Sequence, residues 1–306
     1  MRGAGARVGA AAAAAAAAGG GGSGGDGCSA GADAAPAEEG LATAGANVGW
    51  VGSNPGEAAA YFQRHGMLRV RKLLSEDTCS EMRRHIDELL AKTGGGEQCP
   101  ERFGDVNTKR CRWDMFLRLN PTVLKALREA LGPTLPLWQT LLEEEPQLCE
   151  LSSLISDPGS ERQPLHSDTS QEAGVSSLVT CFIALQDISP DMGPTIMLPR
   201  THSNPKAHRH LAYVCEPELG GLPGPTADIG GLELPVVHCA VSAGDAVLMD
   251  SRLLHCGGAN ISTARRRLMY FTVHERGVEP RGSTYSMLLG YRDALALSEL
   301  EQWGDH

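Results

Sequence analysis

The sequence predicts a mainly β protein with helices on its N-terminal side, built around a double-stranded β-helix (a cupin-like jelly roll). Before Pro146 the apolar residues recur at helical spacing, whereas after it short apolar runs of four to nine residues alternate with turn residues. Many short strands without helices between them are typical of an antiparallel sandwich or barrel. The runs expected to form strands are residues 149–155, 177–185, 195–198, 246–249 and 267–273, with turns at 157–159, 191–194 and 243–245.

The first helical elements follow from caps and apolar spacing. A short helix is expected over residues 56–65, followed by a strand over residues 66–70. Ser75 is expected to cap a second helix, because two acids follow it and acidic side chains favour the N-terminal end of the helix dipole. Lys92 and Gly94 are expected to end this helix.

Two further helices are expected before the β-rich half begins. Asn120-Pro121 predicts the start of one of them, because proline suits the first helical position, and Gly132-Pro133 predicts its end. A last short helix is expected over residues 137–144.

Two polar segments are expected to be irregular. Residues 94–112 predict a mobile loop in which Lys109, Arg110 and Arg112 are solvated, the alternative being contact with an anionic substrate. Residues 203–235, rich in Gly and Pro, predict an insertion near the mouth of the barrel.

Composition narrows the class of protein. The chain has 306 residues and a net charge of −10, which argues against a general nucleic-acid binder. Residues 1–48 are expected to be a disordered Ala- and Gly-rich head, because they cannot supply a core, and residues 49–306 are expected to fold as one domain. No apolar run outside the head is long enough for an integral membrane segment. The default location is the cytoplasm, and organelle targeting by the head is the alternative. Nine cysteines without a CxxC pair indicate free thiols in a reducing compartment.

One short motif and its distant partner carry the chemistry. His166 and Asp168 are two residues apart, so both side chains point to one face of an extended strand. His255 follows 89 residues later, and Arg266 eleven residues after that. Two histidines and one carboxylate form the facial triad of non-haem Fe(II) oxygenases. An HxD pair is common by chance, so His255 and Arg266 are the residues that make this pattern specific. The other histidines considered are expected to be structural or surface residues (His65, His85, His202, His208 and His210).

With these residues in place, the chain resembles the phytanoyl-CoA dioxygenase-like (PhyH) family of Fe(II)/2-oxoglutarate-dependent oxygenases. The resemblance also covers the segments 191–202 (DMGPTIMLPRTH) and 243–260 (AGDAVLMDSRLLHCGGAN). It implies a jelly roll in residues 49–306 that carries the catalytic site. It further implies Fe(II), 2-oxoglutarate and O2, with ascorbate as an optional stimulant. Arg200 departs from the glycine usual before Thr-His, which affects a turn rather than the metal.

The resemblance also implies roles for individual residues. His166, Asp168 and His255 would hold the iron, and Arg266 would pair with the distal carboxylate of 2-oxoglutarate. Strand alternation places Arg265 and Arg267 on the opposite face, although a one-residue shift would exchange their roles. Besides Arg266, the residues assigned to cosubstrate binding are Gln163, Phe182 and Thr195.

The resulting expectation is a dioxygenase that hydroxylates a small or lipid-like organic substrate and releases succinate and CO2. The acid at Asp168 favours a hydroxylase over related halogenases, which carry a small residue there. The alternatives are a non-catalytic metal-binding jelly roll, such as a sensor or inactive relative, and a cupin-like isomerase or hydrolase that uses Zn or Mn. The sequence leaves the substrate and the oligomeric state open.

Overall fold

A computed structural model describes the fold, and its described residues belong to one compact unit, Glu38–His306. The predicted head, residues 1–48, lies outside the described residues. The described ranges are 49–50, 54–106, 110–142, 145–169, 178–211, 224–277 and 286–304.

The largest sheet has seven strands in the order β1-β2-β10-β5-β12-β4-β3. Its pairs are antiparallel except for β1 with β2. The strands are β1 (Gly49–Trp50), β2 (Met67–Val70), β3 (Arg112–Phe116), β4 (Pro146–Ser156), β5 (Val179–Ala184), β10 (Ala246–Asp250) and β12 (Arg266–Glu275). The predicted strands at 149–155, 177–185, 246–249 and 267–273 therefore all belong to this sheet.

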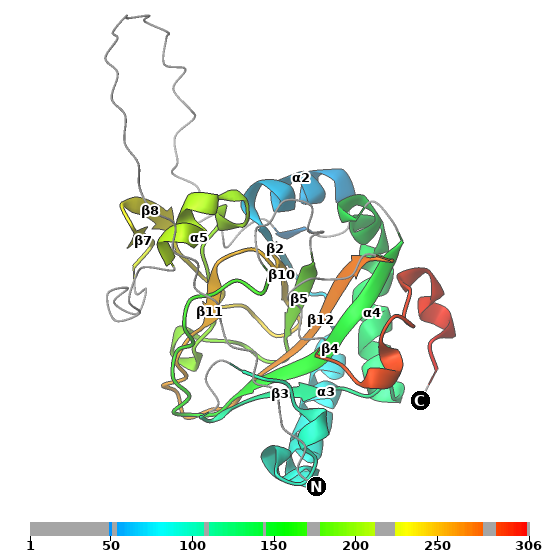
Figure 1. The fold of residues 1–306 in the computed structure, drawn as a ribbon. Helices are drawn as coiled ribbons and strands as arrows, with labels where there is room; N and C mark the ends of the chain where they lie inside the picture. Colours follow the sequence, from blue (N-terminus) through cyan, green and yellow to red (C-terminus); the bar gives the residue numbers. More distant parts are fainter. Residues whose placement is uncertain are drawn as a thin grey trace, which may run out of the picture. The chain divides into compact units, whose positions relative to one another are not determined.

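A second sheet of three strands has the order β11-β6-β9 and contains the remaining predicted strand as β6. Its strands are β6 (Thr195–Met197), β9 (Val237–His238) and β11 (His255–Gly257). Figure 1 shows β11 and the long helix α4 on opposite sides of the large sheet. A mainly β fold with two antiparallel layers confirms the predicted fold class.

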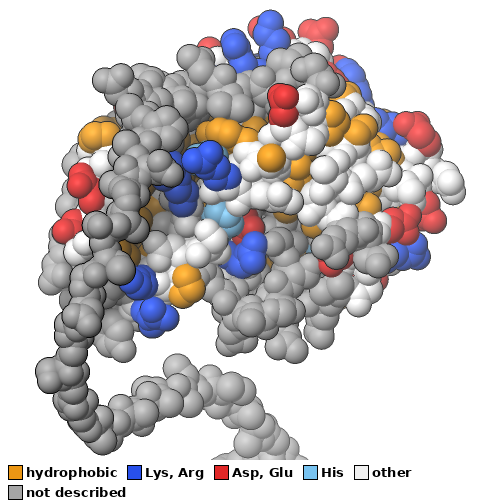
Figure 2. Space-filling view, turned by 90° about the horizontal axis from the view of Figure 1, so that it is seen from above, with side chains coloured by type: hydrophobic (Ala, Val, Ile, Leu, Met, Phe, Trp, Pro, Cys, Tyr) orange, Lys and Arg blue, Asp and Glu red, His pale blue; other side chains and the backbone are white. Residues whose placement is uncertain are grey.

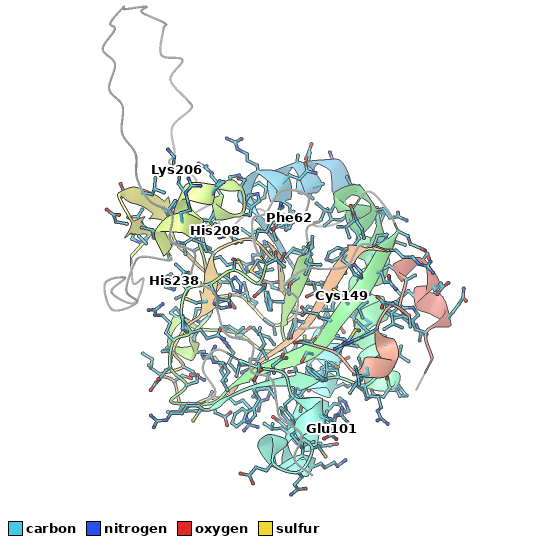
Figure 3. All side chains as sticks on the ribbon, viewed as in Figure 1. Phe62, Glu101, Cys149, Lys206, His208 and His238 are labelled. Atoms are coloured by element: carbon cyan, nitrogen blue, oxygen red, sulfur yellow. The ribbon has the colours of Figure 1, made fainter. Side chains whose placement is uncertain are left out.

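Three helices cover the outer face of the large sheet, and the predicted caps begin them. The helices are α2 (Pro55–His65), α3 (Glu76–Lys92) and α4 (Pro121–Leu141). Each cap side chain, Asn54, Ser75 or Asn120, accepts a hydrogen bond from a backbone N–H in the first turn of its helix. The helices and the outer face of the sheet share one hydrophobic core, which includes Phe62, Met82, Ile86, Leu127, Trp138, Ile155, Ile183, Met269 and Phe271. In Figure 3 Phe62 lies between α2 and the strands below it.

The predicted end of α4 at Gly132-Pro133 is wrong, because one helix of 21 residues continues to Leu141. It includes the segment that was expected to form a separate helix over residues 137–144. Gly132 does not adopt the positive φ that ends a helix. The buried side chains Leu137 and Trp138 extend the apolar stripe, and the Thr134 hydroxyl donates to the carbonyl of Ala130 at 2.7 Å. Tertiary packing therefore outweighs the loss of a backbone donor at proline.

The predicted loop at residues 94–112 is also only partly irregular. It contains two short 3-10 helices, Gly94–Gly96 and Pro100–Arg102, and it ends in strand β3. Arg112 is 3% exposed rather than solvated, whereas Arg110 is exposed as predicted. Lys109 lies outside the described residues. The strand was missed because its inward side chains are charged, which hides the alternation of apolar and polar residues.

The segment 203–235 contains regular elements where it is described, namely α5 (Pro205–Leu211), β7 (Thr226–Ile229) and β8 (Leu232–Pro235). His208 lies on α5 (Figure 3) and bonds the carbonyl of Thr201 at 3.0 Å, so its predicted place in a solvated loop is wrong. His202 bonds the carbonyl of Gln63 at 2.9 Å, which confirms the predicted structural role. The other short helices are 3-10 turns at Pro190–Met192, Thr201–Ser203, Leu289–Tyr291 and Leu297–Gln302.

All described cysteines are free. None of the described helices combines the length and hydropathy that crossing a bilayer requires. On the face drawn in Figure 2, hydrophobic side chains are interspersed with charged ones, and one histidine lies among Lys, Arg and acidic side chains.

The turn before β10 yields a prediction about stability. Gly244 has a φ of 82°, and a Cβ added there would lie 2.1 Å from the carbonyl oxygen of Leu74. Gly231, in the β7–β8 turn, has a φ of 80° but nothing within 4 Å. Both Gly→Ala substitutions should cost about 1–2 kcal/mol because of the left-handed backbone. Gly244→Ala should cost roughly 1–3 kcal/mol more through overpacking. Urea unfolding of both variants measures the difference, and equal losses would contradict the close approach at Gly244.

Candidate active site

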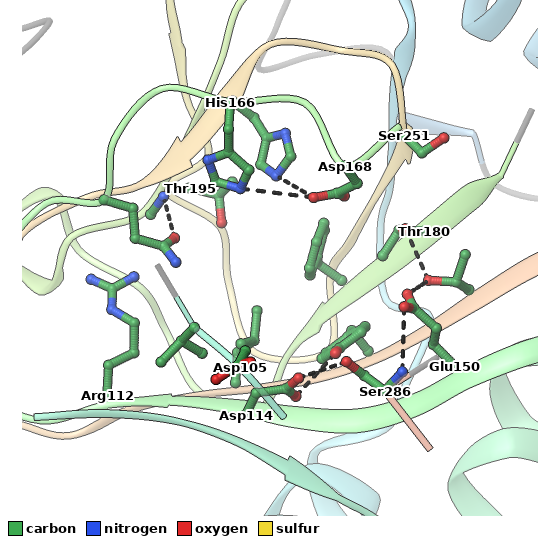
Figure 4. Close-up of a pocket in the computed structure, with 18 of the residues that line it drawn as sticks. Asp105, Arg112, Asp114, Glu150, His166, Asp168, Thr180, Thr195, Ser251 and Ser286 are labelled. Carbon is green, nitrogen blue, oxygen red and sulfur yellow. Dashed lines mark hydrogen bonds and ion pairs between the residues drawn. The ribbon is translucent and has the colours of Figure 1, made fainter. Parts of the chain in front are cut away.

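His166, Asp168 and His255 lie together, as the sequence predicts. One ligand atom from each side chain lies within 4.8 Å of the other two. Asp168 Oδ1 is 3.7 Å from His166 Nε2 and 3.6 Å from His255 Nε2 (Figure 4). Two nitrogen or oxygen ligands about 2.1 Å from a shared ion can lie at most about 4.2 Å apart, so both distances suit one metal. Within the part of the chain that the structure describes, no other group of His, Cys, Asp or Glu side chains has this arrangement.

The two histidines are neighbours because their backbones pair. His166 N–H donates to the carbonyl of His255 at 3.0 Å, and His255 N–H donates to that of His166 at 2.8 Å. This antiparallel bridge adds His166 to the edge of the second sheet, next to β11. The ring centroids are 4.4 Å apart. Backbone hydrogen bonds therefore bring together two histidines that lie far apart in the sequence.

Each histidine ring is oriented by a carbonyl two residues before it in the chain. His166 Nδ1 lies 2.7 Å from the carbonyl of Pro164, and His255 Nδ1 lies 3.0 Å from that of Leu253. A carbonyl only accepts, so Nδ1 carries the proton and Nε2 of a neutral ring is left as a ligand. Burial lowers the pKa of His255 to about 4, which keeps its ring neutral near pH 7.

The triad opens onto a cavity of about 270 Å³, which is bounded by inward side chains of the large sheet and by the second sheet. The structure places all four predicted cosubstrate residues at this cavity, namely Gln163, Phe182, Thr195 and Arg266. Gln163 Oε1 accepts the N–H of Gly257 at 2.9 Å, which leaves the amide NH2 of Gln163 as a donor. Their contact with a cosubstrate stays a prediction.

Of the three consecutive arginines at positions 265–267, Arg266 is the buried one. It is 2% exposed, and its NH2 group donates to Ser156 Oγ at 3.0 Å. Its Nε and NH1 are buried and have no hydrogen-bond partner among the described residues. Burial, with a further contribution from Arg112, lowers the pKa of Arg266 to about 9. A buried guanidinium with open donors is a site that a carboxylate would complete.

The side chains of Arg265 and Arg267 lie on the face of the sheet opposite to Arg266, as strand alternation predicts. Arg267 forms a two-point ion pair with Asp87 of α3, at 2.8 Å for both bonds. Arg265 bonds Asp157 and also Asp87. The structure therefore places Arg266, rather than Arg265 or Arg267, at the cavity.

Arg112 lies at the cavity, which agrees with the alternative of contact with an anionic substrate rather than with the expected solvation. The register of three adjacent strands sets Arg112 and Arg266 on either side of Ser156. Arg112 lines the cavity and donates to the carbonyls of Glu161 at 2.8 Å and Gly258 at 3.1 Å. The sequence signal that could have predicted strand β3 is Trp113, because an aromatic residue between two charged ones fits the alternation of a strand. Trp113 itself points away from the cavity and bonds the carbonyl of Gly95 at 2.9 Å.

The wall contributed by the large sheet carries a hydrogen-bonded carboxyl group, Asp114. Hydroxyl groups of Ser152, Tyr270 and Ser286 all donate to it, the last two at 3.0 and 2.7 Å. Burial raises the pKa of Asp114 to about 6 in spite of these donors. Figure 4 shows Asp114 and Ser286 on the wall across the cavity from the triad.

Comparison with known proteins agrees with this geometry. The sequence model of the phytanoyl-CoA dioxygenase (PhyH) family matches residues 62–268, which is more than half of the chain. The chain is 24% identical over 261 residues to the dioxygenase cnsJ of Penicillium expansum, with 76% of this chain and 71% of that protein covered.

Solved structures share the fold at low identity. HygX from Streptomyces hygroscopicus, with nickel and 2-oxoglutarate bound, has a TM-score of 0.54 at 15% identity and covers 76% of this chain and 96% of its own. EctD from S. alaskensis has a TM-score of 0.55 at 17% identity, with 82% and 90% covered. The carbocyclase SnoK from nogalamycin biosynthesis has a TM-score of 0.52 at 18% identity, with 75% and 87% covered.

The pKa of Asp114 predicts a pH dependence of stability. The folded pKa of about 6 lies above the ordinary value of 3.8, so the native state binds more protons than the unfolded state between these values. Stability should therefore fall as pH rises from about 4 to about 6, by roughly 3 kcal/mol. Asp114→Asn should remove this part of the dependence. Urea unfolding at pH 4 and pH 7 measures it, and an unchanged pH slope in the variant would contradict the buried state of Asp114.

Proposed function

This chain belongs to the phytanoyl-CoA dioxygenase family, whose members use Fe(II) and 2-oxoglutarate, and from that premise we propose that it hydroxylates a small organic substrate and releases succinate and CO2. One observation carries the proposal. The metal triad and an open-donor guanidinium, Arg266, line the same cavity. A structural metal site does not need a carboxylate anchor, whereas a 2-oxoglutarate site does.

The donor set fits iron. His166 and His255 would each present Nε2, and Asp168 would present a carboxylate oxygen, which leaves three positions of an octahedral ion open. The Nδ1–H groups are held by the Pro164 and Leu253 carbonyls, so the ring orientations are set before the metal binds. When bound, Fe(II) with 2-oxoglutarate and O2 would supply the oxidation.

The side chains that line the same cavity fit the cosubstrate. Arg266 would hold the distal carboxylate of 2-oxoglutarate through its open N–H groups, since Nε and NH1 have no hydrogen-bond partner among the described residues. The amide NH2 of Gln163 and the Thr195 hydroxyl add uncharged donors. Phe182 adds an apolar wall that excludes water. Arg112 supplies a second cation on the same face.

The lining favours a polar substrate over a lipid-like one. Apolar side chains such as Leu154 and Leu178 contribute only part of the wall, and most of the rest carries hydroxyl or carboxyl groups. Several of these groups already bond one another, and a long alkyl chain would exclude water from them without offering any hydrogen bond in return, which costs free energy. The polar groups in question include Asp114, Glu150, Thr180, Thr272 and Ser286.

The triad is tested by cosubstrate turnover. The full-length protein with Fe(II), ascorbate and O2 should form succinate from 2-oxoglutarate. The rate of succinate formation should be lower by at least roughly 100-fold in His166→Ala, because the variant loses a metal ligand and with it metal affinity. Equal rates in both proteins would overturn the site. Metal binding without succinate, even with a panel of polar substrates, would instead support a non-catalytic metal protein. Transfer of ¹⁸O from O2 to the organic product separates hydroxylation from epimerisation or ring closure.

The anchor is tested by comparing neighbouring arginines. Arg266→Ala should raise the KM for 2-oxoglutarate by roughly 100-fold, because truncating one partner of a buried charge pair costs about 2–5 kcal/mol. Arg267→Ala, one residue along on the opposite face, should leave that KM unchanged. Both variants are assayed at saturating Fe(II). A larger rise of this KM in Arg267→Ala than in Arg266→Ala would contradict the assignment and would place the carboxylate anchor on the other face of β12.

A further inference from the structure

The turn at residues 250–253, of which only Ser251 lines the cavity, contacts two of the three triad residues. It joins the end of β10 to the start of β11. The carbonyl of Ser251 accepts the N–H of Asp168 at 2.8 Å, and the carbonyl of Leu253 lies 3.0 Å from His255 Nδ1. One turn of four residues therefore holds the backbone of the carboxylate ligand and orients the ring of a histidine ligand.

A two-point ion pair closes this turn. Arg252 Nε donates to Asp250 Oδ1 at 2.8 Å, and its NH2 donates to Oδ2 at 2.6 Å. The backbone N–H of Arg252 also donates to Asp250 Oδ1, at 2.9 Å. The Asp250 side chain is 4% exposed and that of Arg252 is 27% exposed. Neither residue lines the cavity, so the pair does not contact a ligand there.

We infer that the Asp250–Arg252 pair is a positioning device for the metal centre. This inference rests on the proposed function, because it assumes that the triad binds a metal. A guanidinium that bonds both oxygens of a carboxylate has one preferred geometry, so the pair fixes the turn and with it the carbonyls of Ser251 and Leu253. Metal ligands tolerate little displacement, and groups that orient them typically contribute 10–100-fold to affinity. Arg252 and Asp250 thus act on the metal through Asp168 and His255.

The opposite end of β10 offers a matched control. Asp245 directly precedes β10, and its side chain is also 4% exposed. Arg69 of β2 pairs with it at 2.5 Å and is 17% exposed. Asp245 also accepts a backbone N–H, from Lys72 at 2.9 Å. The two pairs match in residue types, burial and strand, but the described bonds of the Arg69–Asp245 pair lie at the end of β10 away from the triad.

The test measures metal affinity without turnover. Metal-free full-length protein is titrated with Co²⁺ by calorimetry and visible absorption, and the difference from His166→Ala isolates binding at the triad. Arg252→Lys keeps the charge but loses the two-point geometry, and it should raise the Kd for Co²⁺ by roughly 10–100-fold. Arg69→Lys should leave that Kd unchanged, although both variants lower the melting temperature.

A second variant guards against loss of folding. The double variant Asp250→Asn/Arg252→Gln leaves no unpaired buried charge, and it should show the same weakening of Co²⁺ binding. A wild-type Kd in either variant, or equal weakening in Arg69→Lys, would overturn the inference. Failure of the proposed function is distinct, because the wild-type protein itself would then bind Co²⁺ no better than His166→Ala.

Discussion

The pair of backbone hydrogen bonds between His166 and His255 is the contact on which the site depends. It joins two motifs whose histidines are 89 residues apart in the sequence. The bridge sets both imidazole rings side by side at the edge of the second sheet. Asp168 then follows two residues along the same extended segment, and its backbone is tied to Ser251. The proposed metal site is therefore an outcome of sheet formation rather than of a preformed local loop.

The large sheet performs two tasks through its two faces. Residues of one parity, such as Met269 and Phe271, pack against the helices, while those of the other parity, such as Arg266 and Tyr270, line the cavity. Helices α3 and α4 thus stabilise a wall whose inner side is polar. Burying Arg112, Asp114 and Arg266 there costs desolvation energy. Hydrogen bonds offset part of that cost. In the proposed function, a cosubstrate carboxylate bound by the open donors of Arg266 would offset more of it.

Much of the β half could be predicted because its strands are apolar runs bounded by turn residues. The errors lie where local signals and packing disagree. Gly132-Pro133 has the composition of a helix end, but the buried face of α4 continues through Trp138. The sequence of strand β3 is polar because Arg112 and Asp114 face the cavity. Charged residues at such positions break the apolar pattern, so the places where sequence rules fail are near the functional site.

The sequence by itself determined the residue types and spacing of the triad, the helix caps and the alternation that separates Arg266 from Arg265 and Arg267. These properties are local, since they depend on neighbours along one strand or one helical turn. Only the tertiary structure decided that His166 pairs with His255, that Arg112 shares a cavity with Arg266, and that Asp250 and Arg252 secure the turn behind two ligands. Each of these depends on which distant strands become neighbours, and pairing between strands is set by the register of whole sheets.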